Sequence, residues 1–234
     1  MKKIFTNYDL KLIATFTMIL DHLAIIFLPS NSIIYMILRF IGRISFPIYA
    51  FLIVEGFFHT KSLTKYLSRL IFLAFISEPI YDYALYNSYF DLTHQNIFFT
   101  LTLGLLTIIL IDKGKNLLSK KITTKTDNFI ISSFLTILTL IILGLANELL
   151  GNSYGFRGIF LISSFYLFRH NFYLIAIILI TSIILTSSPL EIASVFSIIF
   201  IILYNGNLGK SKKSFFYSIY PIHLIVLKLL SFLC

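Results

Sequence analysis

The sequence predicts an all-α membrane protein: a polytopic helical bundle of about nine transmembrane helices, with a range of eight to ten, in one domain spanning residues 1–234. Hydrophobic residues make up 58% of the chain and charged residues 12%, whereas a soluble domain is about half apolar. Apolar segments recur along the whole length, which is typical of a polytopic membrane protein rather than one large soluble core. The basic residues lie in alternate connections between these segments, as they do in membrane proteins.

Short polar stretches, prolines and glycines separate the predicted spans. The spans cover residues 10–29, 33–55, 66–87, 95–112, 129–149, 156–169, 172–187, 189–205 and 215–233. A helix needs about 20 residues to cross the hydrocarbon core, so the sixth to eighth segments are short for a full crossing. No internal repeat, low-complexity tract or long linker divides the chain, and we therefore expect a single domain.

Lys and Arg are enriched in the cytoplasmic loops of membrane proteins. Fifteen of the nineteen here fall on one side of a nine-span topology: Lys2, Lys3, Lys11, Lys61, Lys65, Arg69, Lys113, Lys115, Lys120, Lys121, Lys125, Arg169, Lys210, Lys212 and Lys213. The alternate connections hold only Arg157. This asymmetry predicts a plasma-membrane protein with a cytoplasmic amino terminus. It also accounts for the net charge of +9, so we expect no nucleic-acid partner.

The first span carries an acid and an imidazole, Asp21 and His22, in its second half. Charged groups in hydrocarbon cost at least about 2.5–3.5 kcal/mol each, so they usually face a bundle interior or a wet cavity and mark function. His22 lies eleven positions beyond Lys11, which returns it to the same helix face within about 20° and about 16 Å along the axis. Asp21 projects about 100° away from His22, so we expect it to pair with another helix.

The second and third spans each carry two like charges four residues apart. Arg39 and Arg43 share one helix face in the second span, where Gly42, Ser45 and Pro47 predict close approach and a kink. Glu78 and Asp82 share a face in the third. Two guanidinium groups so placed need anionic partners, which we expect from Asp21 and from Glu78 or Asp82. All these charges fall in the middle or outer half of their spans, so they can converge with His22.

Polar residues mark two further spans. Asn96 stands at the outer start of the fourth span, facing the same compartment. In the last span Tyr220 and His223 are three residues apart on one side of the helix, beside Pro221. His223 is a candidate proton carrier, with a capping or packing role as the alternative. For every intramembrane polar residue the alternative is that it holds helices together.

Several classes of site are not indicated. The five histidines show neither HxxxH nor HExxH spacing, so no metal site is expected. There is no phosphate-binding glycine loop and no GxSxG nucleophile motif. The single cysteine, Cys234, cannot form an intrachain disulfide.

Six blocks occur in the order LKLIATFTMILDH, LRFIGRISFPIYAFLIVEGFFHT, KYLSRLIFLAFISEPIYD, NIFFTLTLGLL, YGFRGIF and FYSIYPIHL. Over nearly the whole chain they resemble the TraX family, integral membrane proteins named for acetylation of a conjugative pilin at its amino terminus. TraX proteins are in turn similar to the transmembrane acyltransferase superfamily. That resemblance implies acetyl-CoA, bound from the cytoplasm, as the acetyl donor to an acceptor across the bilayer. Many of these enzymes carry a basic residue and a histidine with ten residues between them on an early helix, and Lys11 and His22 match this spacing.

A hypothesis for the mechanism follows from this resemblance. His22 would act as general base or accept the acetyl group itself, and we favour the general base because it needs one active-site pocket. Asp21 or Glu78 would hold its tautomer, and Arg39 or Arg43 would neutralise the developing charge. The cations expected to bind the phosphates of the donor are Lys11, Lys61, Lys65, Arg69, Lys113 and Lys115. The partners would be the lipid bilayer and an acceptor, either the amine of a pilin-like or secreted peptide or a hydroxyl of a surface glycan.

Two other functions are compatible with the same residues. A proton-coupled transporter would also use intramembrane Asp, Glu and His, although the chain shows no inverted repeat. A non-catalytic assembly factor would use these residues to bind a partner peptide or to hold partner helices.

Overall fold

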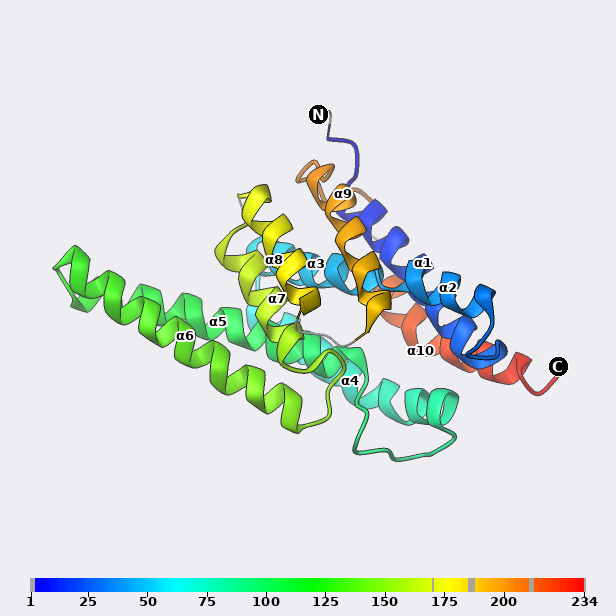
Figure 1. Cartoon of the computed structure of the whole chain (residues 1–234). Coiled ribbons are helices and arrows are strands. Elements are labelled where there is room, and N and C mark those ends of the chain that lie inside the picture. The colour runs from blue at the N-terminus through cyan, green and yellow to red at the C-terminus, as the bar shows by residue number, and fades with distance from the viewer. Residues whose placement is uncertain (1–2, 170, 185–187, 211–212, 234) are drawn as a thin grey trace.

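The computed structural model describes residues 3–169, 171–184, 188–210 and 213–233, and in these ranges the all-α prediction is confirmed. Lys2, Lys212 and Cys234 lie outside the described residues. The elements are α1 (Asn7–Phe27), α2 (Ile33–Gly42), α3 (Ser45–His59), α4 (Leu63–Tyr86), α5 (Ile97–Lys121), α6 (Lys125–Leu149), α7 (Gly155–Leu167), α8 (Phe172–Ile184), the 3₁₀-helix η1 (Pro189–Phe196), α9 (Ser197–Ile202) and α10 (Lys213–Leu230) (Figure 1).

Two predicted spans are interrupted. The segment 33–55 was expected to be one kinked helix, but it is broken at Arg43 into α2 and α3. Pro47 explains the break, because it has no N–H to donate to the carbonyl four residues earlier and its ring collides with that carbonyl. The segment 189–205 is also not one helix, because η1 runs into the short α9.

Among the residues that the structure describes, four segments are long and apolar enough to cross a membrane, taking α2 and α3 together: Asn7–Phe27, Ile33–His59, Ile97–Lys121 and Lys125–Leu149. The apolar helices that follow α6 are shorter, as the sequence indicated for the sixth to eighth spans. The predicted ninth span is also short, at Ser214–Leu230. α4 has a similar length but carries two cations and two acids. The fold is therefore that of a polytopic helical membrane protein.

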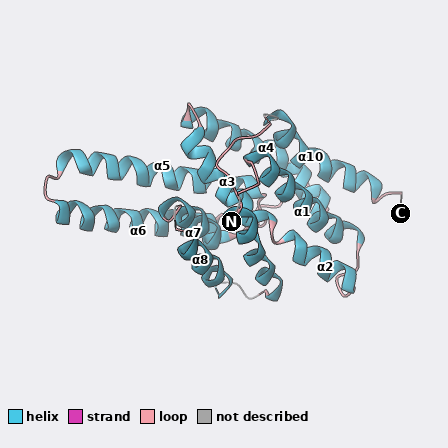
Figure 2. Cartoon of the chain, turned by 90° about the horizontal axis from the view of Figure 1, so that it is seen from above, coloured by secondary structure: helices cyan, strands magenta, loops and turns pink. Residues whose placement is uncertain are grey.

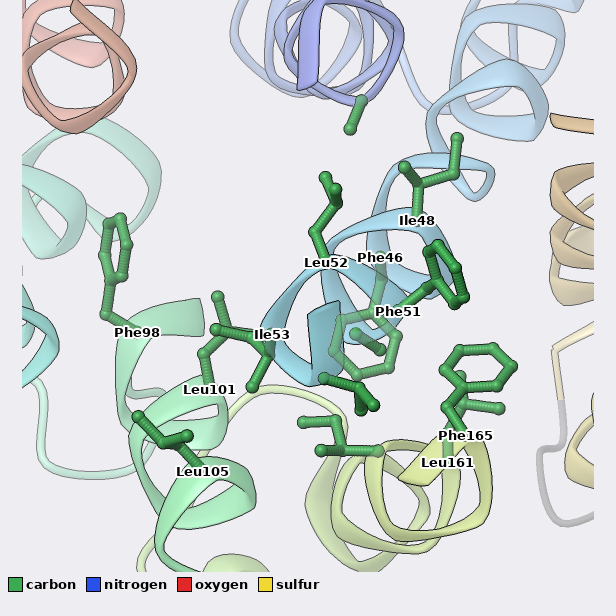
Figure 3. Packing of buried hydrophobic residues seen from close by; sticks show 14 of the residues in the cluster. Phe46, Ile48, Phe51, Leu52, Ile53, Phe98, Leu101, Leu105, Leu161 and Phe165 are labelled. Atoms are coloured by element: carbon green, nitrogen blue, oxygen red, sulfur yellow. The ribbon is translucent and has the colours of Figure 1, made fainter. Parts of the chain in front are cut away.

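Helix α3 lies at the centre of the apolar core. Most of its residues are apolar and buried, which is typical of a helix surrounded by other helices rather than by solvent. Its buried side chains Phe46, Ile48, Phe51, Leu52 and Ile53 pack with Phe98, Leu101 and Leu105 of α5 and with Leu161 and Phe165 of α7 (Figure 3). A Cβ on Gly104 of α5 would overlap Ile162 of α7, so this glycine permits the close contact of those two helices.

Helices α5 and α6 form a long hairpin that extends away from the other helices (Figures 1 and 2). α5 continues past residue 112, where its span was predicted to end, as far as Lys121. Only 11% of the apolar window of α6 is buried, and exposed Phe and Ile side chains run along it. Such a surface suits contact with lipid hydrocarbon.

Chain segments meet at both ends of the bundle. At one end the residues before α1 bond to the chain after α9, with the Phe5 N–H donating to the Leu203 carbonyl at 3.0 Å. At the other end the Gln95 N–H donates to the Gly151 carbonyl at 2.9 Å, which joins the α4–α5 and α6–α7 connections. These two connections were predicted to share the outer side, and the structure places them together.

Candidate functional site

A cavity of about 780 Å³ opens between α1, α2, α3, α4, α7, η1 and α10. We call it the outer cavity, because it lies at the end of the bundle where the α4–α5 and α6–α7 connections meet. Its volume falls within the range of about 300–1,000 Å³ that is usual for ligand sites. Its wall includes the ionisable side chains Asp21, His22, Arg39, Arg43, His94, Glu148, Arg157 and Glu191.

Five of these residues, Asp21, Arg39, Arg43, Arg157 and Glu191, form an alternating chain of charges, here called the arginine cluster. Arg39 Nη1 donates to Asp21 Oδ2 at 2.6 Å, and Arg43 Nη2 donates to both Asp21 oxygens at 2.7 and 2.8 Å. Arg43 Nη1 continues to Glu191 Oε1 at 3.1 Å, and Arg157 Nη2 reaches Glu191 Oε2 at 2.6 Å. Three guanidinium groups thus face two carboxylates, which leaves one positive charge in excess.

The arginine cluster differs in one acid from the ion pairs that the sequence predicted for Arg39 and Arg43. Asp21 does pair with a neighbouring helix, but the second acid is Glu191 rather than Glu78 or Asp82. A sequence signal existed for this pairing. Glu191 is the single acid in its predicted span, and Arg157 is the single cation of the outer connections, so each needed a partner of opposite charge.

Arg157 is positioned by the start of α7. Glu148 Oε2 accepts the Phe156 N–H at 2.7 Å, and a carboxylate is favourable at a helix amino terminus. Tyr154, just before the helix, has a positive φ of 65°, and its ring stacks on Phe46 with centroids 3.7 Å apart. The Arg157 guanidinium lies 5.1 Å from the centre of the same Tyr154 ring, so the aromatic pair supports the arginine.

Glu78, Asp82 and Asn96 instead form the corner between α4 and α5. Asn96 caps α5 by accepting the Phe98 N–H at 2.9 Å, and its side-chain amide donates to Glu78 and to the Ala74 carbonyl. Asp82 accepts the Asp91 N–H at 2.8 Å. None of the three predicted residues is part of the outer cavity wall, so the corner holds two helices together.

His22 is paired with a second histidine. Its Nδ1 lies 2.7 Å from Nε2 of His223 on α10, and His223 Nδ1 lies 2.9 Å from the Ile219 carbonyl. Tyr220 packs its ring edge-on against both imidazoles. The expectation that Asp21 or Glu78 would orient His22 is wrong, because Asp21 bonds to arginines and Glu78 to Asn96.

A second, narrower cavity of about 180 Å³ lies at the other end of the bundle, and we call it the inner cavity. Of the six cations predicted to bind phosphate, Lys11 and Arg69 line it, whereas Lys61, Lys65, Lys113 and Lys115 do not. Its wall also includes Glu55 and His59. Glu55 is only 2% exposed and accepts from Arg169 Nε at 2.8 Å.

Four residues line both cavities, and we call them the shared wall: Met18, Tyr49, Ile97 and Tyr220. Helix α1 passes along both cavities. Lys11 lines the inner cavity, Met18 lines both, and His22 lines the outer one. These three residues are seven and four positions apart, which places them on one face of the helix. The sequence indicated the positions of Lys11 and His22 on this face but not the four residues of the shared wall.

The approach of α1 to α2 depends on Gly42. A Cβ at this position would overlap the Asp21 side chain, so we expect Gly42→Ala to displace that carboxylate and to destabilise the protein by about 1–3 kcal/mol. Thermal unfolding in detergent measures the change. The matched control is Gly114→Ala in α5, where an added Cβ meets nothing within 4 Å and alanine favours the helix by about 1 kcal/mol. Equal melting temperatures for the two variants would contradict this role of Gly42.

The fold and its paired cavities define a polytopic helical membrane protein with a cavity lined by histidine, arginine and acidic side chains. The chain belongs to the TraX family, since the family model described as "TraX protein" matches residues 7–231. It is also 40% identical over 113 residues to the probable fimbrial assembly protein FimC, serogroup H1, of Dichelobacter nodosus. That match covers 45% of this chain and 46% of the relative, so the chain spans about half the length of this curated relative. No solved structure matches the chain.

Proposed function

We propose that this protein is a membrane-embedded acetyltransferase that moves an acetyl group from cytoplasmic acetyl-CoA to an amine or hydroxyl acceptor at the outer side. The observation that carries the proposal is the pair of cavities on the two sides of the shared wall, with Lys11 in one and His22 in the other along a single face of α1. Such an arrangement suits a donor entering from one end and an acceptor entering from the other.

Two features of the inner cavity support acetyl-CoA as the proposed donor. Lys11 and Arg69 provide two positive charges in its wall, which suit phosphate groups. Its volume of about 180 Å³ is below the usual range for compact ligands and suits a thin extended arm, with the nucleotide left at the mouth. The cations Lys61 and Lys65 precede Arg69 in the chain and are proposed to meet the nucleotide outside the cavity.

The outer cavity supplies the acid–base chemistry. His22 Nε2 takes a proton from the acceptor as the acceptor nitrogen or oxygen bonds to the acetyl carbon. The carbon–sulfur bond of the thioester then breaks, and the leaving thiolate receives that proton from His22. Arg39 is better placed than Arg43 to stabilise the developing negative charge. Arg43 uses both terminal nitrogens on carboxylates, whereas Arg39 Nη2 makes no hydrogen bond within the described residues.

The direction of transfer rests on the topology proposed from the loops. With the amino terminus in the cytoplasm, Lys11 and the inner cavity face the cytoplasm and the outer cavity faces the opposite compartment. The plasma membrane is the proposed location. The acceptor is a pilin-like or secreted peptide amine, in keeping with the family and with the fimbrial relative, or a hydroxyl of a surface glycan.

Sealed inverted membrane vesicles test this proposal, because they expose the cytoplasmic side to the added donor. Acetyl-labelled coenzyme A added outside should label peptide or glycan inside vesicles that contain the protein, and mass spectrometry identifies the acceptor. Right-side-out vesicles given the same donor should remain unlabelled. Labelling that does not depend on the protein, or that occurs only in right-side-out vesicles, would refute the assignment.

A non-catalytic assembly role is the second candidate, and the name of the relative, a probable fimbrial assembly protein, favours it. In that case the arginine cluster and the histidine pair would only hold the fold or a partner. Cells carrying His22→Gln discriminate the two functions. Retained fimbrial assembly together with retained acetylation would support the assembly role, whereas loss of acetylation supports the transferase.

The shared wall gives a separate prediction. Met18→Trp should lower the rate of acetyl transfer at least about ten-fold, because a larger side chain at the shared wall would block passage between the two cavities. The rate of label transfer in inverted vesicles measures the effect. Phe16→Trp is the matched control, since Phe16 is on the same helix but 63% exposed. A Met18→Trp rate equal to that of the control would show that the cavities are not the route of transfer.

A further inference from the structure

We propose that His223 is a positioning residue that locks His22 in the tautomer with its proton on Nδ1, so that the bare Nε2 is presented to the outer cavity. This inference rests on the proposed function of His22 as a general base, and it names the group that makes the base competent. His22 lines the outer cavity, whereas His223 is not part of the cavity wall and lies behind it.

The hydrogen bonds assign the protons by elimination. The Ile219 carbonyl can only accept, so His223 Nδ1, at 2.9 Å from it, must carry a proton. In a neutral imidazole the other nitrogen is then an acceptor, so His223 Nε2 accepts. The group facing it at 2.7 Å is His22 Nδ1, which must therefore be the donor. His22 is left with a lone pair on Nε2, the form that a general base requires.

The ring geometry supports this assignment. The two imidazole planes are within 9° of parallel, and their centroids are 5.0 Å apart. That centroid separation is about the largest that a nitrogen–nitrogen distance of 2.7 Å allows, so the rings lie end to end rather than face to face. In this arrangement the N–H and the lone pair point along the line between the rings, which is favourable for a strong hydrogen bond.

The surroundings keep the pair intact. His22 and His223 are 9% and 7% exposed, and Tyr220, at 4%, packs edge-on against both rings. Water therefore has little access to replace either imidazole as a partner. The nearby acids are not available either, since Asp21 is bound by two arginines and Glu191 by two.

The arrangement also serves the charged form of the base. After His22 Nε2 has taken a proton, its Nδ1–H still points at His223 Nε2, and a hydrogen bond from a charged donor is shorter and stronger than a neutral one. His223 thus has the position that a carboxylate has in serine hydrolase triads, where the wrong tautomer lowers turnover by about 10⁴-fold. A neutral imidazole performs this role without adding another negative charge to the membrane interior.

Nitrogen-15 NMR of the histidine-labelled protein in lipid tests the tautomer directly and needs no enzyme activity. The signals of His22 are identified by their disappearance in His22→Gln. We expect a protonated Nδ1 and an unprotonated Nε2 in the unmodified protein. A proton on Nε2 in that protein would overturn the proposal, whatever the outcome of the transfer assay. The expected tautomer in a protein that transfers no acetyl group would instead refute the proposed function and leave the histidine pair standing.

Two variants of His223 supply the functional readout. In His223→Gln the side-chain oxygen can still accept from His22 Nδ1, whereas His223→Leu fills similar space without an acceptor. We expect about a 10²-fold or larger loss of transfer rate in the leucine variant and a mixed His22 tautomer in its spectrum. The glutamine variant should recover most of the rate and the single tautomer. Equal rates and equal spectra for the two variants would show that His223 only fills space.

Discussion

Replacement of His22 with alanine is expected to lower the rate of acetyl transfer by at least about 10²-fold, the lower end of what a general base contributes. The side chain lines the outer cavity, and its Nε2 makes no hydrogen bond within the described residues. His22→Gln should lose as much as the alanine variant, because an amide keeps polarity and approximate size but cannot take a proton. Label transfer from acetyl-coenzyme A in inverted vesicles measures both rates.

Phe16→Ala provides the control for the His22 variants. It removes a large side chain from the same helix at a position facing away from both cavities, and it should keep the unmodified rate. Thermal unfolding of all three proteins in detergent separates loss of chemistry from loss of fold. Unchanged transfer by a folded His22→Gln protein would remove the acid–base role from this residue.

Asp21→Asn is expected to destabilise the protein by about 3–5 kcal/mol, the cost of breaking a buried ion pair by removing one charge. The Asp21 carboxylate accepts hydrogen bonds from both Arg39 and Arg43. Its loss leaves three guanidinium groups facing the single carboxylate of Glu191, in side chains that are between 8% and 20% exposed. The midpoint of thermal unfolding in detergent gives the measurement.

Asp127→Asn is the comparison for Asp21→Asn, because Asp127 is an exposed acid in the first turn of α6 and its replacement should destabilise the protein by no more than about 1 kcal/mol. A double variant, Asp21→Asn with Arg39→Gln, should recover part of the lost stability, since it removes one of the unpaired cations. If Asp21→Asn had the same melting temperature as Asp127→Asn and the unmodified protein, Asp21 would not be holding the arginine cluster.

Much of the fold could be predicted from composition and spacing. Residues that must avoid water form long apolar segments, and in a bilayer these segments must be helical, because only a helix satisfies its own backbone hydrogen bonds. The same local reasoning marked Pro47 as a point of distortion. It did not show that the distortion is a complete break, because the helix α3 that follows is stabilised by burial among α5 and α7 rather than by its own sequence.

The candidate site, too, could be predicted only in part. Spacing on a helix is a local property, so helix periodicity alone places Lys11 and His22 on one face, and likewise Arg39 and Arg43. The assignment of partners could not be made in this way. Glu78 and Asp82 were reasonable partners by depth, yet they stabilise the corner between α4 and α5.

The amino-acid sequence by itself determined that this is a helical membrane protein with charges at depth and that each of these charges needs a partner. Only the tertiary structure decided which partner each one has. Arg43 meets Glu191 across 148 positions of the chain, and His22 meets His223 across 201. Helix periodicity fixes directions within one element, whereas contacts between distant helices depend on how all of them pack together, and that packing decides what surrounds the imidazole of His22.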